Sequence, residues 1–344
     1  MKDVYTFDEL NDHHDYAREH VVNGQRLHGG FDAGGNYIPP RTRSRAEALA
    51  NWQRKLEAAG GSLFEADASL LTGPRMPNSE QQRLLLANGL TRPFWNGLTI
   101  TGKIEARGRV LAEMQFPDLQ QLVVEDISRM ALGHLNKGLL VAHGIDEGGE
   151  PDKGIGGHDV MWFVARDLVI PPGTHPDVQP PESISRPEAG KRWMPEIAQP
   201  YEMFLSFLMN LLMIEFRAEI GFASTQQVLR APELFTDHRA AAEDAAEIIE
   251  RIRTDETIHV WGLRLVLGEL RQLHVRTVDG GTMPAAPLID RFWAGLVSWA
   301  VHEQPVLAAQ TAYPALREQI LDSGRGDALL DDFCKLADAG ALPA

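Results

Sequence analysis

Glu256 and His259 are the pair of residues in this sequence whose types and spacing most clearly suggest chemistry. Residues three apart lie on one face of a helix, and the rest of this face is apolar. Its residues, spaced alternately by three and four, are Ala242, Ala245, Ile249, Ile252, Glu256, His259, Leu263, Val266 and Leu270. Such a seam packs against a partner helix, where an unpaired carboxylate costs several kcal/mol. The pattern predicts either a metal held by this pair or a core histidine bonded to a buried glutamate.

A second carboxylate, Glu215, lies in a similar seam of a helix predicted over residues 201–230. Pro232 ends that helix, and residues 236–237 can cap the next one, which carries Glu256. Each glutamate is about twenty residues from the turn near residue 235, so at 1.5 Å per residue the two lie level. We therefore expect Glu215 to face Glu256 across a helix pair. With His259, these residues would form half of a two-metal site.

The first half of the chain offers only weaker candidates, which are Glu105, Glu125, Asp126, His134 and His158. Glu105 lies in a helix predicted over 94–116 and has an ion pair with Arg109 as its alternative role. His134 lies on the apolar seam of a helix predicted over 118–143, where a core histidine is the alternative. That helix has no Glu-x-x-His, and Glu125 lies about 180° around it from His134. His158 can reach inward from a loop or simply lie on the surface.

The elements that would position these residues are predicted to be helical. Besides the helices above, we expect helices over 44–59 and 79–88 and a helical region over 289–321, with loops at 22–43 and 275–287 and a solvated helix within 1–20. Residues 144–200 contain 9 prolines and 8 glycines in 57 residues, with 158–168 a short helix or strand. This long crossover is expected to be mobile and to cover the site. No sustained strand alternation supports a Rossmann fold or a barrel.

This arrangement resembles the ferritin-like di-iron carboxylate superfamily, whose four-helix bundles hold metal with Glu and Glu-x-x-His residues. The resemblance implies an all-α fold with a four-helix bundle core over 94–274 and its crossover at 144–200, an extension over 1–93, and C-terminal helices over 275–344. It implies Glu215, Glu256 and His259 as ligands, with Glu105 and His134 toward the first half. Two iron or manganese ions are expected, and a single ion is the alternative. In such proteins the reduced metal pair binds dioxygen and oxidises a small organic substrate.

Composition limits the alternatives. The 344 residues carry a formal net charge of −15, which argues against nucleic acid and anionic membranes as partners. The single cysteine, Cys334, and the absence of a signal-peptide pattern lead us to expect a cytoplasmic protein. A monomer and a homodimer both remain open. A second hypothesis is a non-enzymatic helical bundle that binds an apolar small molecule or a partner, based on the Met- and Leu-rich helix 201–230 and on Trp293 and Trp299.

Overall fold

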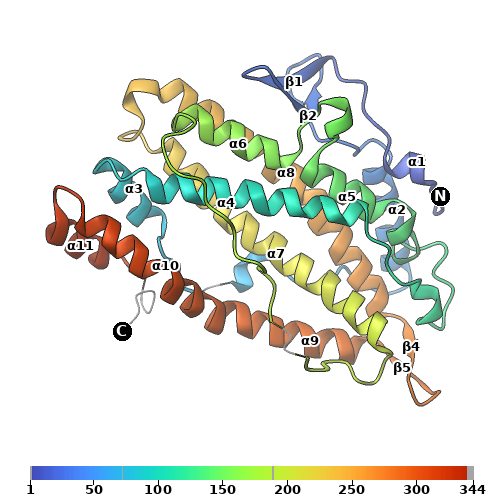
Figure 1. Ribbon diagram of the computed structural model, residues 1–344. Coiled ribbons are helices and arrows are strands. Elements are labelled where there is room, and N and C mark those ends of the chain that lie inside the picture. The colour runs from blue at the N-terminus through green and yellow to red at the C-terminus, as the bar shows by residue number, and fades with distance from the viewer. Residues whose placement is uncertain (1, 72, 188–189, 339–344) are drawn as a thin grey trace.

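The computed structural model describes residues 2–71, 73–187 and 190–338 and is mostly helical (Figure 1). Its described part contains eleven α-helices: α1 Phe7–Leu10, α2 Arg45–Ala58, α3 Ser79–Ala87, α4 Arg92–Gly108, α5 Leu139–Gly148, α6 His158–Val169, α7 Gln199–Arg230, α8 Arg239–Arg271, α9 Ala286–Ser298, α10 Gln304–Leu321 and α11 Gly326–Lys335. A three-stranded antiparallel sheet comprises β1 Arg18–Val22, β2 Gln25–Phe31 and β3 Tyr37–Ile38, and β4 His274–Arg276 pairs with β5 Thr282–Pro284. The sequence-based expectation of a predominantly helical protein is therefore confirmed.

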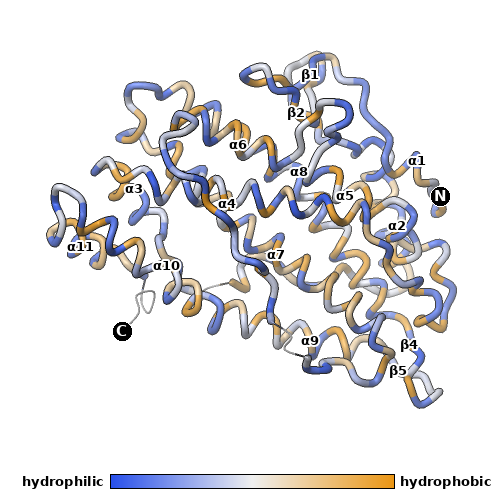
Figure 2. Tube along the Cα trace, in the orientation of Figure 1, coloured by the Kyte–Doolittle hydropathy of each residue, from blue (hydrophilic) through white to orange (hydrophobic). Residues whose placement is uncertain are grey.

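The two longest helices, α7 and α8, pack along each other, and α6 packs against both α4 and α8. All nine positions of the α8 seam are buried, as their spacing predicts. Along α7 and α8, hydrophobic residues alternate with hydrophilic ones, as expected of helices that bury one face (Figure 2). Two apolar clusters occupy the interior. One cluster includes the apolar residues of α8 up to Ile252, and the other includes those from Ile258 onward. Glu256 and His259 therefore lie at the boundary between the two clusters.

The chain between α4 and α5 does not form the long helix predicted over 118–143. Instead it runs through short 3₁₀ turns, at Arg109–Ala112, Leu119–Gln121 and Leu132–Lys137. Side chains that bond to nearby backbone compete with helix formation here. Asp118 accepts from the N–H of Gln120, and Asp126 accepts from the N–H of Ser128. The prediction of a continuous helix was wrong because the spacing of apolar residues carries no information about these side-chain to backbone hydrogen bonds.

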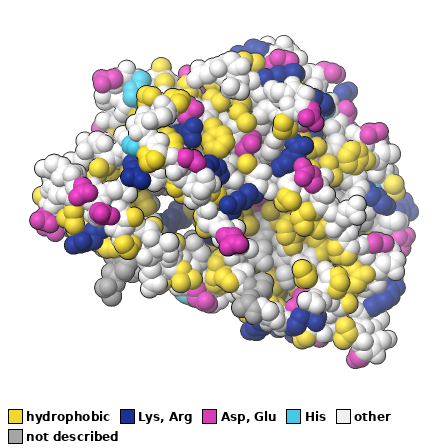
Figure 3. All heavy atoms as spheres, in the orientation of Figure 1, with side chains coloured by type: hydrophobic (Ala, Val, Ile, Leu, Met, Phe, Trp, Pro, Cys, Tyr) yellow, Lys and Arg dark blue, Asp and Glu magenta, His cyan; other side chains and the backbone are white. Residues whose placement is uncertain are grey.

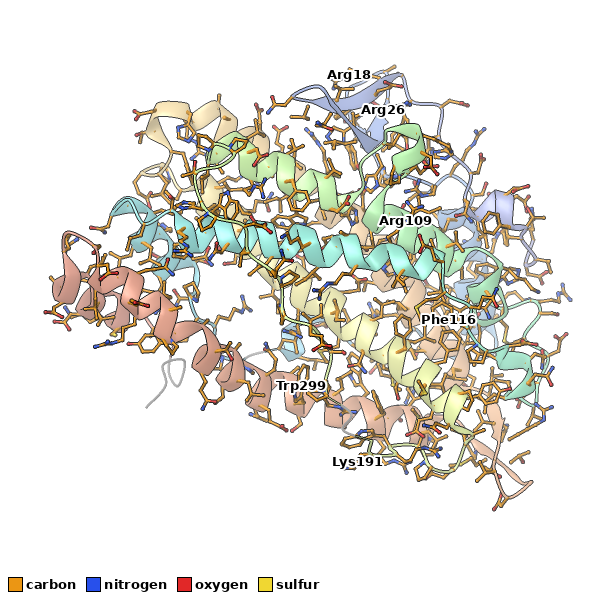
Figure 4. All side chains as sticks on the ribbon, in the orientation of Figure 1. Arg18, Arg26, Arg109, Phe116, Lys191 and Trp299 are labelled. Atoms are coloured by element: carbon orange, nitrogen blue, oxygen red, sulfur yellow. The ribbon has the colours of Figure 1, made fainter. Side chains whose placement is uncertain are left out.

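The second half of α5 and all of α6 lie within residues 144–200, which the sequence suggests are a Gly- and Pro-rich crossover. The glycines of α5 allow close packing rather than a loop. A Cβ on Gly144 would lie 2.5 Å from the backbone nitrogen of Ala112, and one on Gly148 would lie 2.5 Å from the Cβ of Arg109. Arg109 is labelled in Figure 4 where α4 ends beside α5. Residues 144–169 are therefore packed structure, and 158–169 form a helix, which is one of the two forms expected there.

The remainder of the crossover includes residues 171–187, which we call the strap. Figure 1 shows this segment running across α4 and toward α9. Lys103 on α4 forms an ion pair with Asp177 at 2.7 Å, and Arg107 donates to the carbonyl of Pro181 at 2.6 Å. The strap is therefore tied to the outer face of α4.

The two ends of the chain also differ in detail from the sequence-based expectations. Residues 22–43, predicted as a loop, contain β2 and β3. Between residue 2 and the start of β1 at Arg18, the chain forms only the short helix α1. His20 is buried, with its ring edge-on to Phe31 and Tyr37. The helical region predicted over 289–321 corresponds to α9 and α10, and α10 packs with α11. Within the described residues, none of the helices combines the length and the apolar character needed to cross a membrane.

Candidate metal centre

Seven buried side chains from five helices converge between the two apolar clusters. They form two groups, within each of which one potential ligand atom per residue lies within 4.8 Å of the others. The first group is His143, Glu147, Glu215 and His259, and the second is Glu105, Glu147, His158 and Glu256. Glu147 belongs to both groups, and a 2.6 Å contact between His259 Nδ1 and Glu256 Oε2 also links them. Four carboxylates and three imidazoles thus surround two adjoining positions.

Local helix geometry explains how each side chain reaches the centre. His143 and Glu147 are one turn apart on α5, so both project from the same face. His158 is the first residue of α6, while Glu105 lies near the end of α4. None of the seven residues is more than 8% exposed. The centre is therefore screened from water, and its charges interact strongly.

Two imidazole nitrogens in the centre lack hydrogen bonds although carboxylates are close. His143 Nε2 lies 3.0 Å from Glu215 and 3.3 Å from Glu147. His158 Nδ1 lies 2.9 Å from Glu256 and 3.6 Å from Glu147. Neither nitrogen has a hydrogen-bond partner among the described residues. Each nitrogen faces carboxylates of its own ligand group, so the donor set fits a metal at each of the two positions.

Protons balance the charges when no cation is present. Burial, followed by repulsion from Glu147, raises the pKa of Glu105 well above its usual range. Burial and then Glu256 raise the pKa of Glu215 to about 7. Burial and Glu147 act to raise the pKa of Glu256, but His158 and His259 overcome them and hold it at about 2. The same carboxylates tend to keep the imidazoles protonated, so a metal would have to displace protons from this centre.

His259 is oriented from outside the centre by a buried ion-pair network. Its Nε2 lies 3.0 Å from Asp146, and its Nδ1 faces Glu256. Arg41 Nε donates to Asp146 at 2.8 Å, and Arg45 Nη2 donates to the same carboxylate at 2.6 Å. Burial alone would raise the pKa of Asp146, but the two arginines hold it well below its usual range. A carboxylate behind the far nitrogen of a histidine is the usual support for a metal ligand.

His158 has a similar support on its outer side. Its Nε2 lies 3.4 Å from Asp255, while its Nδ1 faces the centre. Asp255 also accepts a hydrogen bond from the hydroxyl of Tyr37 at 2.9 Å and lies 3.1 Å from His28 Nε2. His28, His158 and Asp255 form a third group with metal-ligand spacing. Because Tyr37 and both histidines share one oxygen of Asp255, we interpret this group as the outer shell of His158.

Four of the five residues predicted as metal ligands come together here, namely Glu105, Glu215, Glu256 and His259. The fifth, His134, does not join them. Its Nε2 accepts from the N–H of Tyr5 at 3.2 Å, its Nδ1 lies 2.7 Å from the carbonyl of Met130, and its ring packs on Trp52. This corresponds to the core histidine that the sequence left open as the alternative. Its partners Tyr5 and Trp52 belong to the N-terminal segment and to α2, away from the candidate centre.

The other weak candidates have various locations. Glu125 bonds to His274 near the surface, and Asp126 caps the backbone of Ser128. Glu105 does not pair with Arg109, which lies 3.7 Å from Glu113 instead. His158 is completely buried in the centre and is not a surface loop residue.

Sequence reasoning missed Glu147 and His143 because the predicted helix ended at residue 143 and a loop was expected to follow. The signal that could have found them is the spacing His143-x-x-x-Glu147, which puts an imidazole and a carboxylate on one helical face. Asp146 and Asp255 were also missed. Each immediately precedes a glutamate of the centre in the sequence.

Two cavities adjoin the centre on the side of α4 and α7. The smaller, of about 240 Å³, is lined by His143, Glu147, Glu215 and Glu105 together with strap residues 182–185. The larger, of about 400 Å³, shares Glu105 and Ile184 with it. A small molecule in these cavities would therefore contact the carboxylates of the centre.

The chain matches no protein-family model, no curated protein and no solved structure. Its buried clusters of histidine, glutamate and aspartate could hold a metal ion.

Proposed function

We propose that this protein is a metal-dependent oxidase or oxygenase whose centre binds two iron or manganese ions and which acts on a small organic substrate. The observation that carries the proposal is the pair of adjoining ligand groups that share Glu147. Carboxylate-rich sites with imidazoles suit iron and manganese, and four carboxylates with two or more histidines are the donor set of two-metal carboxylate bundles. The likeness to the ferritin-like superfamily rests on this donor set.

The protein's residues would hold the metals in defined ways. His158 and His259 would bind through Nδ1, because Asp255 and Asp146 occupy the far side of each ring. His143 would bind through Nε2, which faces Glu147 and Glu215. Glu147 is common to both groups, so it would help to hold both ions. The metals would supply the activation of dioxygen and the oxidising power.

The remaining work of the site falls to the surrounding side chains. Arg41 and Arg45 neutralise Asp146 and so fix the orientation of His259. The two apolar clusters exclude water, which prevents side reactions and strengthens every charge interaction in the centre. The smaller cavity brings a substrate to Glu105, Glu147 and Glu215.

Elemental analysis of protein purified without chelator tests the proposal directly, followed by reconstitution with ferrous iron under oxygen and an absorption spectrum. We expect close to two metal ions per chain, and loss of metal in His259→Ala with the far-ultraviolet circular dichroism retained. His134→Ala is the matched control, because His134 is also a buried histidine but lies outside the centre. Metal-free parent protein that gains no metal on reconstitution would refute the proposal, as would full metal content in His259→Ala.

A non-enzymatic protein that binds an apolar small molecule is the second candidate. The cavity of about 400 Å³ between α4 and α7 supports it, since small-molecule pockets have this size. The two candidates differ in metal content, which the same elemental analysis measures.

A further inference from the structure

The larger cavity has walls that are mainly apolar. Its described lining comes chiefly from α4 and α7 and includes Phe94, Leu98, Ile104, Trp162, Ile214 and Phe222. Along α7 it extends from Ile214 to Thr225, or about 16 Å at 1.5 Å per residue. Figure 3 shows a hollow on this face between the parts of the surface formed by α4 and α10, with Lys or Arg side chains on its wall. The cavity therefore has room for an elongated apolar body.

Two helical glycines face this cavity and leave it open. A Cβ added to Gly97 on α4 or to Gly221 on α7 would meet no atom within 4 Å, and both residues line the cavity. By contrast, Gly102 on α4 packs closely, since its Cβ would lie 2.7 Å from the ring of Phe163. A glycine in a helix interior is about 1 kcal/mol less stable than alanine. Close packing explains Gly102, whereas Gly97 and Gly221 are explained by the space that they provide.

A positively charged side chain without a carboxylate partner lines the same cavity. Arg217 donates from Nη1 to the carbonyl of Ile184 at 2.8 Å, and its guanidinium lies 5.7 Å from the ring of Trp299. Trp299 is labelled in Figure 4, where the chain passes from α9 to α10. Within the described parts of the chain, Arg217 forms no ion pair with an acidic residue. Burial lowers its pKa, but a guanidinium stays protonated in proteins, so most of its donors are available to a ligand.

The charges around the cavity are distributed unevenly. Among its described lining residues, Arg75 and Arg217 are the cations, and Glu105 of the metal centre is the single acid. Arginine pairs with carboxylates through two parallel N–H···O bonds. A ligand with a carboxylate and an apolar body would satisfy both the unpaired guanidinium and the apolar walls. A neutral ligand of the same shape would leave the guanidinium unpaired.

We propose that this cavity binds a small organic carboxylate, with the carboxylate on Arg217 and the apolar body between α4 and α7 beside Glu105. The inference that this ligand is the substrate rests on the proposed function, but its binding does not require metal. The strap takes part through Ile184, whose carbonyl holds Arg217 in place.

The test compares acids with their neutral amides: phenylacetate, 4-phenylbutyrate and octanoate against the corresponding amides. Binding is followed by calorimetry and by the fluorescence of the tryptophans, including Trp162 in the cavity wall. We expect at least one acid to bind roughly tenfold or more tightly than its amide, as hydrogen bonds to charged groups imply. Arg217→Gln should abolish that preference. Arg230→Gln is the matched control, because Arg230 lies on the same helix but pairs with Glu243 on the surface.

A second pair of variants tests the location without removing a charge. Gly221→Leu should fill the cavity and weaken binding of acid and amide alike by tenfold or more, whereas Gly221→Ala should leave binding unchanged. The proposal is overturned if no acid of the series binds, if acid and amide bind equally to the parent, or if Arg217→Gln keeps the preference. Metal content is measured on the same samples. Metal in the parent without acid preference contradicts this inference alone, and acid preference without metal contradicts the proposed function alone.

Discussion

Replacing Glu215 by glutamine should raise stability at pH 8 without metal but not with metal bound. Burial and the neighbouring Glu256 raise the pKa of Glu215 from 4.5 to about 7. An acid with a raised pKa in the folded state destabilises the protein once the pH is high enough to ionise it. The destabilisation begins near the pKa of the unfolded state and is complete above the pKa of the folded state. Each pKa unit corresponds to about 1.4 kcal/mol, so ionised Glu215 costs about 3 kcal/mol at pH 8 and almost nothing at pH 4.5.

In metal-free protein, Glu215→Gln removes this destabilisation at pH 8. At roughly 2 °C per kcal/mol, the melting temperature should rise by about 6 °C. The substitution also removes the charged partner that lies 3.0 Å from His143, which makes the rise in melting temperature somewhat smaller. His143 still has Glu147 at 3.3 Å. The difference from the parent should shrink as the pH falls from 7 to 4.5.

In metal-loaded protein, the same substitution removes an anionic ligand. This effect adds to the metal-free change: a hundredfold loss of metal affinity at saturating metal lowers stability by about 3 kcal/mol. At pH 8 it cancels the metal-free gain, so the melting temperature should stay close to that of the parent. At pH 5, where that gain is small, the melting temperature should fall by several degrees. The assay is differential scanning calorimetry of parent and variant, with chelator or with added ferrous iron under argon, at pH 5 and pH 8. Glu219→Gln, one turn further along α7 and paired with Arg253 at the surface, is the control and should behave alike in both conditions. An equal rise with and without metal would refute the placement of metal beside Glu215.

Three further outcomes are expected. Metal affinity should increase from pH 6 to pH 8, and binding should release protons. The reason is that burial, which lowers the pKa of His259, is outweighed by Glu256 and Asp146, which raise that pKa well above its usual range. Calorimetry in two buffers of different ionisation enthalpy measures the proton release, and a pH-independent affinity would contradict the prediction. Asp146→Asn should weaken metal binding by roughly 10- to 100-fold, measured by competition with a chelator, and an unchanged affinity would remove its supporting role. Gly97→Ala should raise the free energy of unfolding by up to about 1 kcal/mol in urea denaturation, since the added methyl meets open space, and destabilisation would show that the wall is closed there.

Local sequence periodicity determined the two longest helices, α7 and α8, and about half of the centre. The seams of α7 and α8 identify which face is buried, because a helix repeats every 3.6 residues whatever it packs against. A glutamate and a histidine within such a face must enter the interior, so Glu215, Glu256 and His259 could be predicted from spacing alone. Equal distances from one turn were enough to expect the two glutamates to be level.

The tertiary structure alone decided the other half. The glycines around α5 resemble those of a loop in the sequence, yet Gly144 is small because the 3₁₀ turn at Arg109–Ala112 passes over it. His134 lies in an apolar pattern of helical period, but no long helix forms there and its neighbours are Tyr5 and Trp52. Glu147 and His158 approach Glu256 only because α5 and α6 pack against α4 and α8. Periodicity gives the direction of a side chain relative to its own helix, whereas the identity of what it meets depends on contacts between residues far apart in the chain.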